Sequence, residues 1–476
     1  MSEQKYQIGM VGLGVMGRNL LLNMADHGYA VAGYDKDESK VKALENEASG
    51  REILAASEIT SFVESLRKPR AVMMLVPAGA AVDSVIHDLL PHLEKGDLII
   101  DGGNSHFTDT DRRAKDMDQK GLAYLGVGIS GGESGARHGP SMMPGGHRDA
   151  YERIRPIFEA AAAHVNGDAC VTYLGPGSAG HYVKMVHNGI EYGIMQLIAE
   201  SYDLMKRGLG LSNDELHAVY NRWNQAELNG YLMEITANIF LQEDDKSNKR
   251  LIDMILAEAK QKGTGMWTSQ DAMTVQVPVP TIDMAVVMRN MSAYAAERKE
   301  ASQVLTGPQA SFQGERQAFI EQLRNALYAS VILTYAQGMA QLRTASSENH
   351  YDLNLEAVAR IWRGGCIIRA ALLEDIRNAF KARRDLPNLL LDKKFGQAVS
   401  NRQKELRSVI QSATNLGIPI PGMMSALSYF DAYRSAWLPA NLIQAQRDYF
   451  GSHTYERVDE EGVFHTHWEQ RQGEVQ

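Results

Sequence analysis

A glycine motif near the N-terminus limits the fold of this chain more than any other feature. Gly12-x-Gly14-x-x-Gly17 directly follows an apolar segment and opens a helical pattern, Met16–His27. Glycines at this spacing permit a tight turn and close backbone approach, so that a pyrophosphate can lie at the helix N-terminus. The motif therefore predicts a right-handed βαβ unit that binds a dinucleotide. A glycine-rich turn without a ligand is the alternative.

Short β-branched runs alternate with helical patterns around this motif, which is typical of a parallel α/β sheet. The clearest predicted strands are Lys5–Val11, Ala30–Tyr34, Ala71–Val76, Leu98–Ile100 and Leu122–Val127. Most of them are followed by Gly, Pro or Asp, as expected where a buried strand turns into a loop. We expect a Rossmann-type dinucleotide-binding domain over residues 1–178, in a chain of mixed α/β and all-α class.

Helix-period segments dominate after Gly180, and two of them recur. The pattern Leu-x-Ala-Val-x-x-x-Trp occurs at Leu216–Trp223 and Leu355–Trp362, and Gly-x-x-Gln-Leu occurs at Gly193–Leu197 and Gly338–Leu342. The offsets of 139 and 145 residues differ by a plausible loop insertion. We therefore expect a large duplicated helical domain over residues 179–435, with chance similarity as the alternative. A tail over residues 436–476 resembles an arm more than a core helix.

An acidic loop ends the second predicted strand. Asp35 lies 18 residues after Gly17, where a carboxylate accepts hydrogen bonds from the adenosine ribose hydroxyls of NAD. Asp37 and Glu38 follow, with Lys36 as the only nearby cation in the sequence. A ribose 2′-phosphate would face these carboxylates, and such like-charge contacts commonly decide specificity. NAD is thus the expected cofactor, with NADP as the second choice; for Asp37 and Glu38 the acidic first turn of a helix is the alternative.

Polar side chains line one face of the predicted helix over Gly180–Tyr192. Its positions i, i+3, i+4 and i+7 are Lys184, His187, Asn188 and Glu191. Lys184 and Glu191 are two turns apart, about 10 Å along the axis, which suits a base and an acid on either side of a small substrate. In the second copy the same positions are apolar: Ala329, Ile332, Leu333 and Ala336. The face is therefore expected to be buried, where unsatisfied polar groups are costly. This favours a ligand site over a solvated face.

Two loops are expected beside this helix. Asp101-Gly-Gly-Asn104-Ser105 follows a predicted parallel strand, at the edge where ligands bind in open α/β sheets. Ser130-Gly131-Gly132 ends a later strand and can offer a hydroxyl and backbone N–H groups to a carboxylate. Each is alternatively an ordinary glycine turn.

Composition excludes several other classes of protein. The net charge of -9 argues against nucleic-acid binding, which needs a basic surface. Cys170 and Cys366 are far apart and outside any metal-ligand spacing, which suits a reducing cytosol. No stretch approaches the length of a membrane span and no signal peptide is visible. We expect a soluble cytoplasmic protein without a structural metal, a membrane or a nucleic-acid partner.

Taken together, these segments resemble the 6-phosphogluconate dehydrogenase family. The shared signatures are Asp101-Gly-Gly-Asn104, Gly128-Ile-Ser-Gly-Gly-Glu133, Gly139-Pro-Ser-x-Met-Pro-Gly-Gly146, the run Gly180–Tyr192, Lys262-Gly-Thr-Gly-x-Trp267, and Asn441–Gly451. They span nearly the whole chain, and the last is specific to the long form. The resemblance implies a homodimer whose tail penetrates the partner subunit. It also implies oxidation of the carbon-3 hydroxyl of 6-phosphogluconate, loss of carbon dioxide, and release of ribulose 5-phosphate.

The resemblance also implies roles for individual residues. Lys184 would be the general base and Glu191 the acid that protonates carbon-1 of the enediol, with no metal required. The cofactor would contact Gly12, Gly14, Met16, Gly17, Asp35, Lys36, Val76 and Asn104. The substrate hydroxyls and carboxylate would contact Asn104, Ser130, Gly131, Gly132, His187 and Asn188. Its phosphate would contact Tyr192, Lys262, Arg289, and Arg447 and His453 of the other chain. An ordinary surface arginine is the alternative for Arg289.

Three departures from the family pattern matter. NADP-linked relatives typically carry Asn-Arg-Ser or Asn-Arg-Thr in place of Asp35-Lys36-Asp37, and often Lys in place of Pro77. Both departures favour an NAD-preferring variant. Met266 replaces a common Lys, and we have no functional account of it.

Two rival functions make different predictions. A 3-hydroxyisobutyrate-type dehydrogenase would share the glycine motif and the Lys184 helix but lack the duplicated half and the tail. A catalytically silent dinucleotide sensor would have lost its base or acid, yet Lys184 and Glu191 are both present. A scaffold protein would not explain the polar stripe.

Overall fold

The computed structural model describes residues 5–308 and 310–468 of the chain. These residues belong to two compact units, Met1–Leu427 and Ser428–Gln476. The division of the chain into three domains, with boundaries after residues 178 and 435, stays a prediction.

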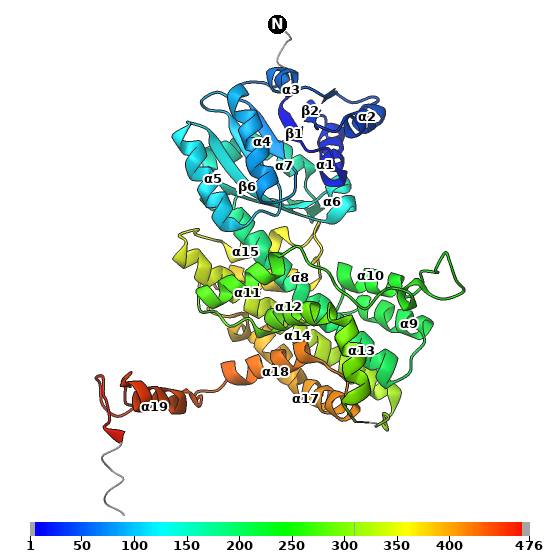
Figure 1. Ribbon diagram of the computed structural model, residues 1–476, viewed down its shortest axis with the longest axis vertical. Coiled ribbons are helices and arrows are strands. Elements are labelled where there is room, and N and C mark those ends of the chain that lie inside the picture. The colour runs from blue at the N-terminus through cyan, green and yellow to red at the C-terminus, as the bar shows by residue number, and fades with distance from the viewer. Residues whose placement is uncertain (1–4, 309, 469–476) are drawn as a thin grey trace, which may run out of the picture. The chain divides into compact units, whose positions relative to one another are not determined.

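A seven-stranded sheet forms the N-terminal part of the first unit (Figure 1). Its order is β3-β2-β1-β4-β5-β6-β7, with every neighbouring pair parallel except β6 and β7. The strands are β1 Ile8–Val11, β2 Val31–Tyr34, β3 Ile53–Ala56, β4 Ala71–Met74, β5 Leu98–Asp101, β6 Ala123–Ser130 and β7 Ser141–Gly146. The order changes direction between β1 and β4. In open α/β sheets the crevice beyond the carboxyl ends of the strands at this point is where ligands bind.

Helices cover both faces of this sheet. They are α1 Val15–Asp26, α2 Glu38–Glu47, α3 Ile59–Ser65, α4 Ala80–Leu89, α5 Phe107–Gln119, α6 Gly132–His138 and α7 Arg148–Ala161. One apolar core lies under α1, α2, α6 and α7 and includes Leu20, Leu44 and Ile154. The other lies under α3, α4 and α5 and includes Phe62, Ile86 and Met117. Burial on both faces explains why β1, β2, β4 and β5 are continuously apolar rather than alternating.

The predicted Rossmann-type fold is confirmed, and so are its five predicted strands, each with shifted ends. The observed β1 begins at Ile8 rather than Lys5, and β4 ends at Met74 rather than Val76. Two strands were missed. Strand β3 is a half-buried sheet edge, and β7 contains Pro144 and two glycines, which strands tolerate mainly at edges and bulges.

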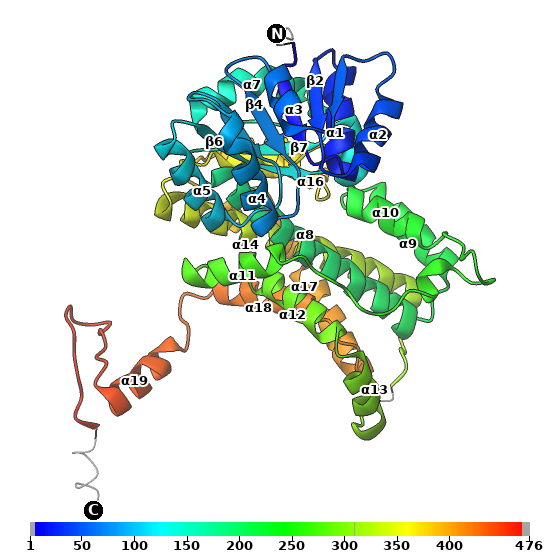
Figure 2. The ribbon, with the colours of Figure 1, turned by 45° about the horizontal axis from the view of Figure 1, so that its top comes forward.

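Long helices make up the rest of the first unit, with α8 lying between the sheet and the other helices (Figure 2). They are α8 Ala179–Asp203, α9 Asn213–Asn224, α10 Tyr231–Ile239, α11 Thr264–Thr274, α12 Pro280–Ser292, α13 Ala295–Val304, α14 Arg316–Glu348, α15 Leu355–Ile361, α16 Leu372–Ala382, α17 Lys393–Leu416 and α18 Pro421–Tyr433, the last of which continues into the second unit. A short hairpin, β8 His164–Val165 and β9 Asp168–Ala169, precedes them. None of the helices among the described residues is both long and apolar enough to cross a membrane.

The two halves of the helical part correspond as the repeat predicts. α8, α9 and α10 in the first half match α14, α15 and α16 in the second, and Trp223 and Trp362 are both fully buried. The halves meet through two reciprocal hydrogen bonds: Tyr231 N to Arg369 O at 2.9 Å, and Ala371 N to Asn229 O at 3.0 Å. Tyr231 and Ala371 differ by 140 positions, and so do Asn229 and Arg369, so the two bonds exchange equivalent positions of the two halves.

The second unit folds on itself around a helix, α19 Ala440–Gly451. An antiparallel bridge pairs Tyr455 with Phe464, through bonds of 2.9 and 2.8 Å. The expected arm therefore contains both a helix and a turn of chain that returns to it.

Candidate active site

The glycine turn after β1 forms one wall of the crevice. Gly12 has a φ of 94°, and a Cβ there would lie 2.6 Å from the carbonyl oxygen of Leu75. At Gly14 an added Cβ would meet nothing within 4 Å, so this part of the turn faces open space. No side chain caps α1, and its first turn contains no acidic residue. This helix end can therefore receive a pyrophosphate, because its N–H groups and dipole favour an anion.

The carboxylate of Asp35 lies directly beside this turn. Its Oδ2 accepts a hydrogen bond from Leu13 N at 2.8 Å and its Oδ1 accepts one from Asp37 N at 2.9 Å. Asp37 caps α2 through Ser39 N at 3.0 Å and Glu38 is in the first turn, so the alternative interpretation of these two residues as a helix start agrees with the structure.

The cations near Asp35 differ from the expected set. Lys36 pairs with Asp88 of α4 at 2.6 Å. Lys40 of α2 lies 3.5 Å from Asp35 Oδ2, so the expectation that Lys36 is the only nearby cation was wrong. The physical reason is the helical turn of α2, which brings a residue five positions away back to the loop.

The polar stripe lies on α8 and is buried, as predicted. Lys184, His187 and Asn188 are 6%, 0% and 8% exposed, and Glu191 is half-buried. Their counterparts on α14, Ala329, Ile332, Leu333 and Ala336, are all fully buried. The solvated-face alternative is excluded for α8.

Hydrogen bonds connect the stripe. Lys184 Nζ donates to Asn188 Oδ1 at 2.8 Å, and Asn188 Nδ2 donates to Thr264 Oγ1 of α11 at 3.0 Å. His187 Nδ1 lies 3.1 Å from Asn188 Oδ1, and its Nε2 lies 3.3 Å from Ser130 Oγ. With hydrogen on Nδ1, the ring donates to Asn188 and accepts from Ser130. The stripe is therefore joined to the end of β6.

Burial moves the pKa values in this cluster toward the neutral forms. It lowers the pKa of Lys184, against the attraction of Glu191, and lowers the pKa of His187 well below its usual value. It raises the pKa of Glu191, against the attraction of Lys184 and Arg289. Neutral His187 forms no ion pair with Glu191 across their 3.7 Å separation. The site thus contains an amine suited to accept a proton and a carboxyl suited to donate one.

The close approach of α8 to the sheet sets the position of Lys184. A Cβ at Gly128 of β6 would lie 2.3 Å from Lys184 Cβ, so only glycine allows this contact. Gly180 at the start of α8 makes a similar approach, with an added Cβ 2.2 Å from Met143 O of β7. The glycines of the two family-like segments therefore place α8 directly on the strands.

Tyr192 and Arg289 meet at the other end of the stripe. The Arg289 guanidinium carbon lies 3.7 Å from the centroid of the Tyr192 ring, and its Nη1 donates to Lys260 O at 3.0 Å. A Cβ at Gly265 would lie 2.3 Å from the Tyr192 ring, so α11 also packs on it. Arg289 is therefore held beside the stripe rather than free in solvent.

The loop after β5 lies against the loop after β4. Asp101 is the last residue of β5, one residue beyond the predicted end of this strand, and its Oδ1 accepts from Gly103 N at 3.0 Å. A Cβ at Gly103 would lie 3.1 Å from Val76 O. Asn104, the next residue of this loop, is exposed.

Other predicted site residues lie outside this cluster of contacts. Lys262 is exposed on the segment before α11, and Met266 is 36% exposed on α11 itself. Arg447 and His453 are exposed in the second unit, where Arg447 Nη1 donates to Gln444 Oε1 at 3.1 Å. Their contribution to a site in another subunit stays a prediction.

Sequence reasoning missed several residues that hold the site together. The ring of Trp362 packs edge-on against His187, with centroids 5.5 Å apart, and Ile367 N donates to Ser130 Oγ at 3.4 Å. Thr264, which binds Asn188, was inside a quoted motif but had no assigned role. The recurring Leu-x-Ala-Val-x-x-x-Trp pattern could have pointed to Trp362. Ile367 binds through its backbone N–H, so no sequence pattern could have indicated it. Within residues 5–308 and 310–468, no group of three or more His, Cys, Asp or Glu could hold a metal ion.

Comparisons with known proteins agree with this geometry. A family model described as the NAD binding domain of 6-phosphogluconate dehydrogenase matches residues 7–175, and one described as the C-terminal domain of that enzyme matches residues 180–468. The chain is 52% identical over 465 residues to an NADP(+)-dependent, decarboxylating 6-phosphogluconate dehydrogenase of Bacillus subtilis, covering 98% of this chain and 99% of the relative. It is 50% identical over 465 residues to the decarboxylating enzyme of Salmonella typhimurium, with 98% and 99% covered.

A solved structure supports the same assignment. The 6-phosphogluconate dehydrogenase of Plasmodium falciparum, described as apo and in complexes with NADP+ and with 6-phosphogluconate, superposes with a TM-score of 0.94 at 45% identity. The match covers 97% of this chain and 100% of that one.

Proposed function

The chain belongs to the 6-phosphogluconate dehydrogenase family of decarboxylating oxidoreductases, and we propose that Lys184 and Glu191 are its general base and general acid. The observation that carries this proposal is the buried stripe on α8. It places an amine and a carboxyl with opposite pKa shifts on one helix face beside the sheet crevice.

Lys184 starts the reaction in its neutral form. Its buried amine removes the proton of the carbon-3 hydroxyl while the nicotinamide, when bound, accepts the hydride from that carbon. The protonated amine then donates a hydrogen bond to the new carbonyl oxygen. It stabilises the negative charge that develops there as the carboxylate leaves as carbon dioxide.

Glu191 completes the reaction by protonating carbon-1 of the enediol. Burial raises the pKa of the carboxyl, which favours the protonated form that this step uses. Asn188 and His187 hold the substrate hydroxyls. When substrate enters, hydrogen bonds to these hydroxyls replace part of the bonding between the two side chains. Ser130, Gly131 and Gly132 orient the carboxylate end, together with Asn104.

The phosphate of the substrate binds at the Tyr192 end of the stripe. Arg289 is already stacked there, and Lys262 lies on the segment leading into α11. We expect Arg447 and His453 of a second subunit to complete this cationic set in a cytoplasmic homodimer. An acidic protein can bind an anionic substrate in this way because the cations converge locally.

NAD is the preferred cofactor in this proposal, although the Bacillus relative is named as NADP(+)-dependent. The support is Asp35, whose carboxylate is fixed beside the glycine turn and 12% exposed. It can accept hydrogen bonds from the ribose hydroxyls, whereas a 2′-phosphate would be repelled. Lys40 partly offsets this repulsion, so NADP is expected to be used less efficiently rather than rejected.

Initial rates with 6-phosphogluconate and either NAD or NADP, measured in EDTA, test the proposal. Reduced cofactor and carbon dioxide are followed together. Equal release of both products, with higher kcat/KM for NAD, is the expected result. A higher kcat/KM with NADP would contradict the cofactor preference and leave the reaction intact.

Replacing Asp35-Lys36-Asp37 by Asn-Arg-Ser tests the loop directly. The change removes the fixed carboxylate and adds a guanidinium that can pair with a 2′-phosphate. We expect the ratio of kcat/KM for NAD to that for NADP to fall by at least about tenfold, as for a change of about 1.4 kcal/mol. An unchanged ratio would refute the role assigned to this loop.

A further inference from the structure

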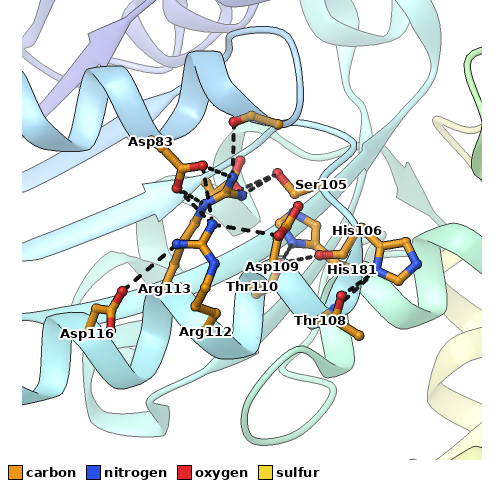
Figure 3. Close-up of polar contacts among 12 residues, drawn as sticks. Asp83, Ser105, His106, Thr108, Asp109, Thr110, Arg112, Arg113, Asp116 and His181 are labelled. Carbon is orange, nitrogen blue, oxygen red and sulfur yellow. Dashed lines mark hydrogen bonds and ion pairs between the residues drawn. The ribbon is translucent and has the colours of Figure 1, made fainter.

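A buried arginine on α5 joins the two loops on which cofactor and substrate are proposed to meet. Arg113 is 1% exposed. It follows Arg112, which is half exposed, so two adjacent arginines differ sharply in their surroundings (Figure 3). Burying a guanidinium is costly unless its N–H groups are satisfied.

All five N–H groups of Arg113 have an acceptor within reach. On the cofactor side, Nε and Nη2 contact Asp83 Oδ1 and Oδ2 of α4 at 2.8 and 3.0 Å, and Nη2 donates to Gly79 O at 3.0 Å. On the substrate side, Nη1 donates to Ser105 Oγ at 3.2 Å and lies 3.5 Å from Asp101 Oδ2. The planar fork of arginine suits such a divided set of acceptors, which the point charge of lysine does not.

The two loops that Arg113 joins are also in direct contact. Between the loops, Gly102 N donates to Met74 O at 2.9 Å. Within the loop after β5, Ser105 Oγ donates to Asp101 Oδ2 at 2.6 Å. The segment from Val76 to Gly79 leads into α4, and Asn104 lies between the anchored residues Gly103 and Ser105. The position of Asn104 relative to Val76 therefore depends on this backbone contact and on the side chain of Arg113, which binds both loops.

We infer that Arg113 is a positioning residue for hydride transfer: it fixes Asn104 and Val76 relative to each other, and so aligns substrate carbon-3 with the nicotinamide. The inference rests on the proposed roles of Asn104 and Val76. Arg113 touches neither substrate nor cofactor. It acts through the loops, by its contacts with Gly79 and Ser105.

The test compares Arg113→Lys with Arg112→Lys in the full-length enzyme. The control residue also contacts Asp83, at 3.0 Å, but has no bond to Gly79 or Ser105. kcat, both KM values and the primary deuterium isotope effect are measured with substrate deuterated at carbon-3. For Arg113→Lys we expect kcat to fall by about ten- to a hundredfold, as for a misplacement of about 1 Å, with a larger isotope effect. Arg112→Lys should match the unchanged enzyme.

A purely structural role would give a different result. It would lower the melting temperature and the fraction of active protein, while leaving the isotope effect and the kcat per active site unchanged, and that outcome overturns the inference. Ser105→Ala removes the Arg113 contact with Ser105 Oγ and the bond from Ser105 Oγ to Asp101, but it keeps the contact of Arg113 with Asp101. It should change the isotope effect in the same direction by a smaller factor. An unchanged isotope effect in both Arg113→Lys and Ser105→Ala would also overturn the inference. Failure of the proposed function is distinct, because the unchanged enzyme would then not turn over 6-phosphogluconate.

Discussion

At the scale of single residues, burial shifts the pKa values of ordinary side chains in the directions that the proposed chemistry needs. Lys184 and Glu191 would both be charged in water, at the pKa values usual for these groups. Removing water from α8 disfavours both charges, and their mutual attraction only partly restores them. The opposed shifts therefore come from the environment of the helix rather than from an unusual residue.

Glu191→Gln is expected to change the pH profile of kcat/KM at both ends. The alkaline limb should disappear, because the group that must stay protonated no longer titrates. The acidic limb should move to lower pH, because the carboxylate that favours protonated Lys184 is gone and the pKa of Lys184 falls further. The rate should drop by about 10²–10⁴-fold, as for loss of a general acid.

Glu200→Gln provides the matched control for this profile. Glu200 is also a buried acid on α8, and burial raises its pKa to about 7, although Gln196, Gly422 and Met423 donate hydrogen bonds to it. Its titration could produce an alkaline limb by itself. If Glu200→Gln removes that limb while Glu191→Gln leaves it in place, the assignment of Glu191 is wrong.

At the scale of elements, the duplicated helices show how a site arises from a packing unit. α8 and α14 cross where each has a glycine: a Cβ at Gly193 would lie 2.6 Å from Thr334, and one at Gly338 would lie 2.5 Å from Ile190. Both helices are buried, yet the four equivalent positions are polar in α8 and apolar in α14. One copy keeps the packing role, and the other combines packing with chemistry.

At the same scale, the buried carboxylate of Asp448 of α19 organises the second unit. Asp448 is fully buried, and its Oδ1 accepts from Thr454 N at 2.9 Å and contacts His465 Nδ1 at 2.8 Å. Its Oδ2 accepts from Thr466 N at 3.0 Å and Trp468 Nε1 at 2.9 Å. These bonds attach the returning chain to the helix that carries Arg447, and they hold the turn that carries His453.

Asp448→Ala should therefore loosen the tail and weaken substrate binding. We expect faster amide exchange at Thr454 and Thr466, and a rise of roughly tenfold in the KM for 6-phosphogluconate with a smaller change in kcat, as for lost ground-state binding. Asp459→Ala is the control, because Asp459 is an exposed partner of Arg457 only, and exposed pairs contribute little. Faster exchange with an unchanged KM would show that the tail does not bind substrate.

At the scale of the whole molecule, the proposed tail exchange predicts complementation between inactive subunits. Lys184→Met removes the base, and Arg447→Ala removes a phosphate ligand that is expected to act in the other subunit. In a mixed dimer, one site would receive both defects and the other neither. Random mixing at equal amounts should therefore restore about a quarter of the activity of the unchanged enzyme, since half of the dimers are mixed and each has one intact site.

Co-expression of the two variants with different affinity tags gives the measurement. Dimers that carry both tags are isolated, and their activity is compared with that of each single-variant dimer. No recovery in the doubly tagged fraction would mean that Lys184 and Arg447 serve the same subunit's site. A double-tagged fraction that cannot be isolated would contradict the dimer itself.

Local sequence patterns determined much of this protein without reference to its folded form. The glycine motif, the apolar strands and the period of Gly180–Tyr192 depend on neighbours within a few turns, so they predicted the βαβ unit and the shared face of Lys184 and Glu191. Comparing the repeat also predicted that this face is buried. The edge strands β3 and β7 escaped prediction because half of β3 is alanine, which is depleted in strands, and β7 contains Pro144 and two glycines.

Only the tertiary structure decided which distant residues complete the site. Thr264 reaches Asn188 across 76 positions of sequence, and Ile367 reaches Ser130 across 237. Arg113 looks like its neighbour Arg112 in the sequence, yet one is buried between two loops and the other faces solvent. Contacts of this kind depend on how helices and strands pack, and packing is set by the sum of many weak contacts rather than by any local pattern.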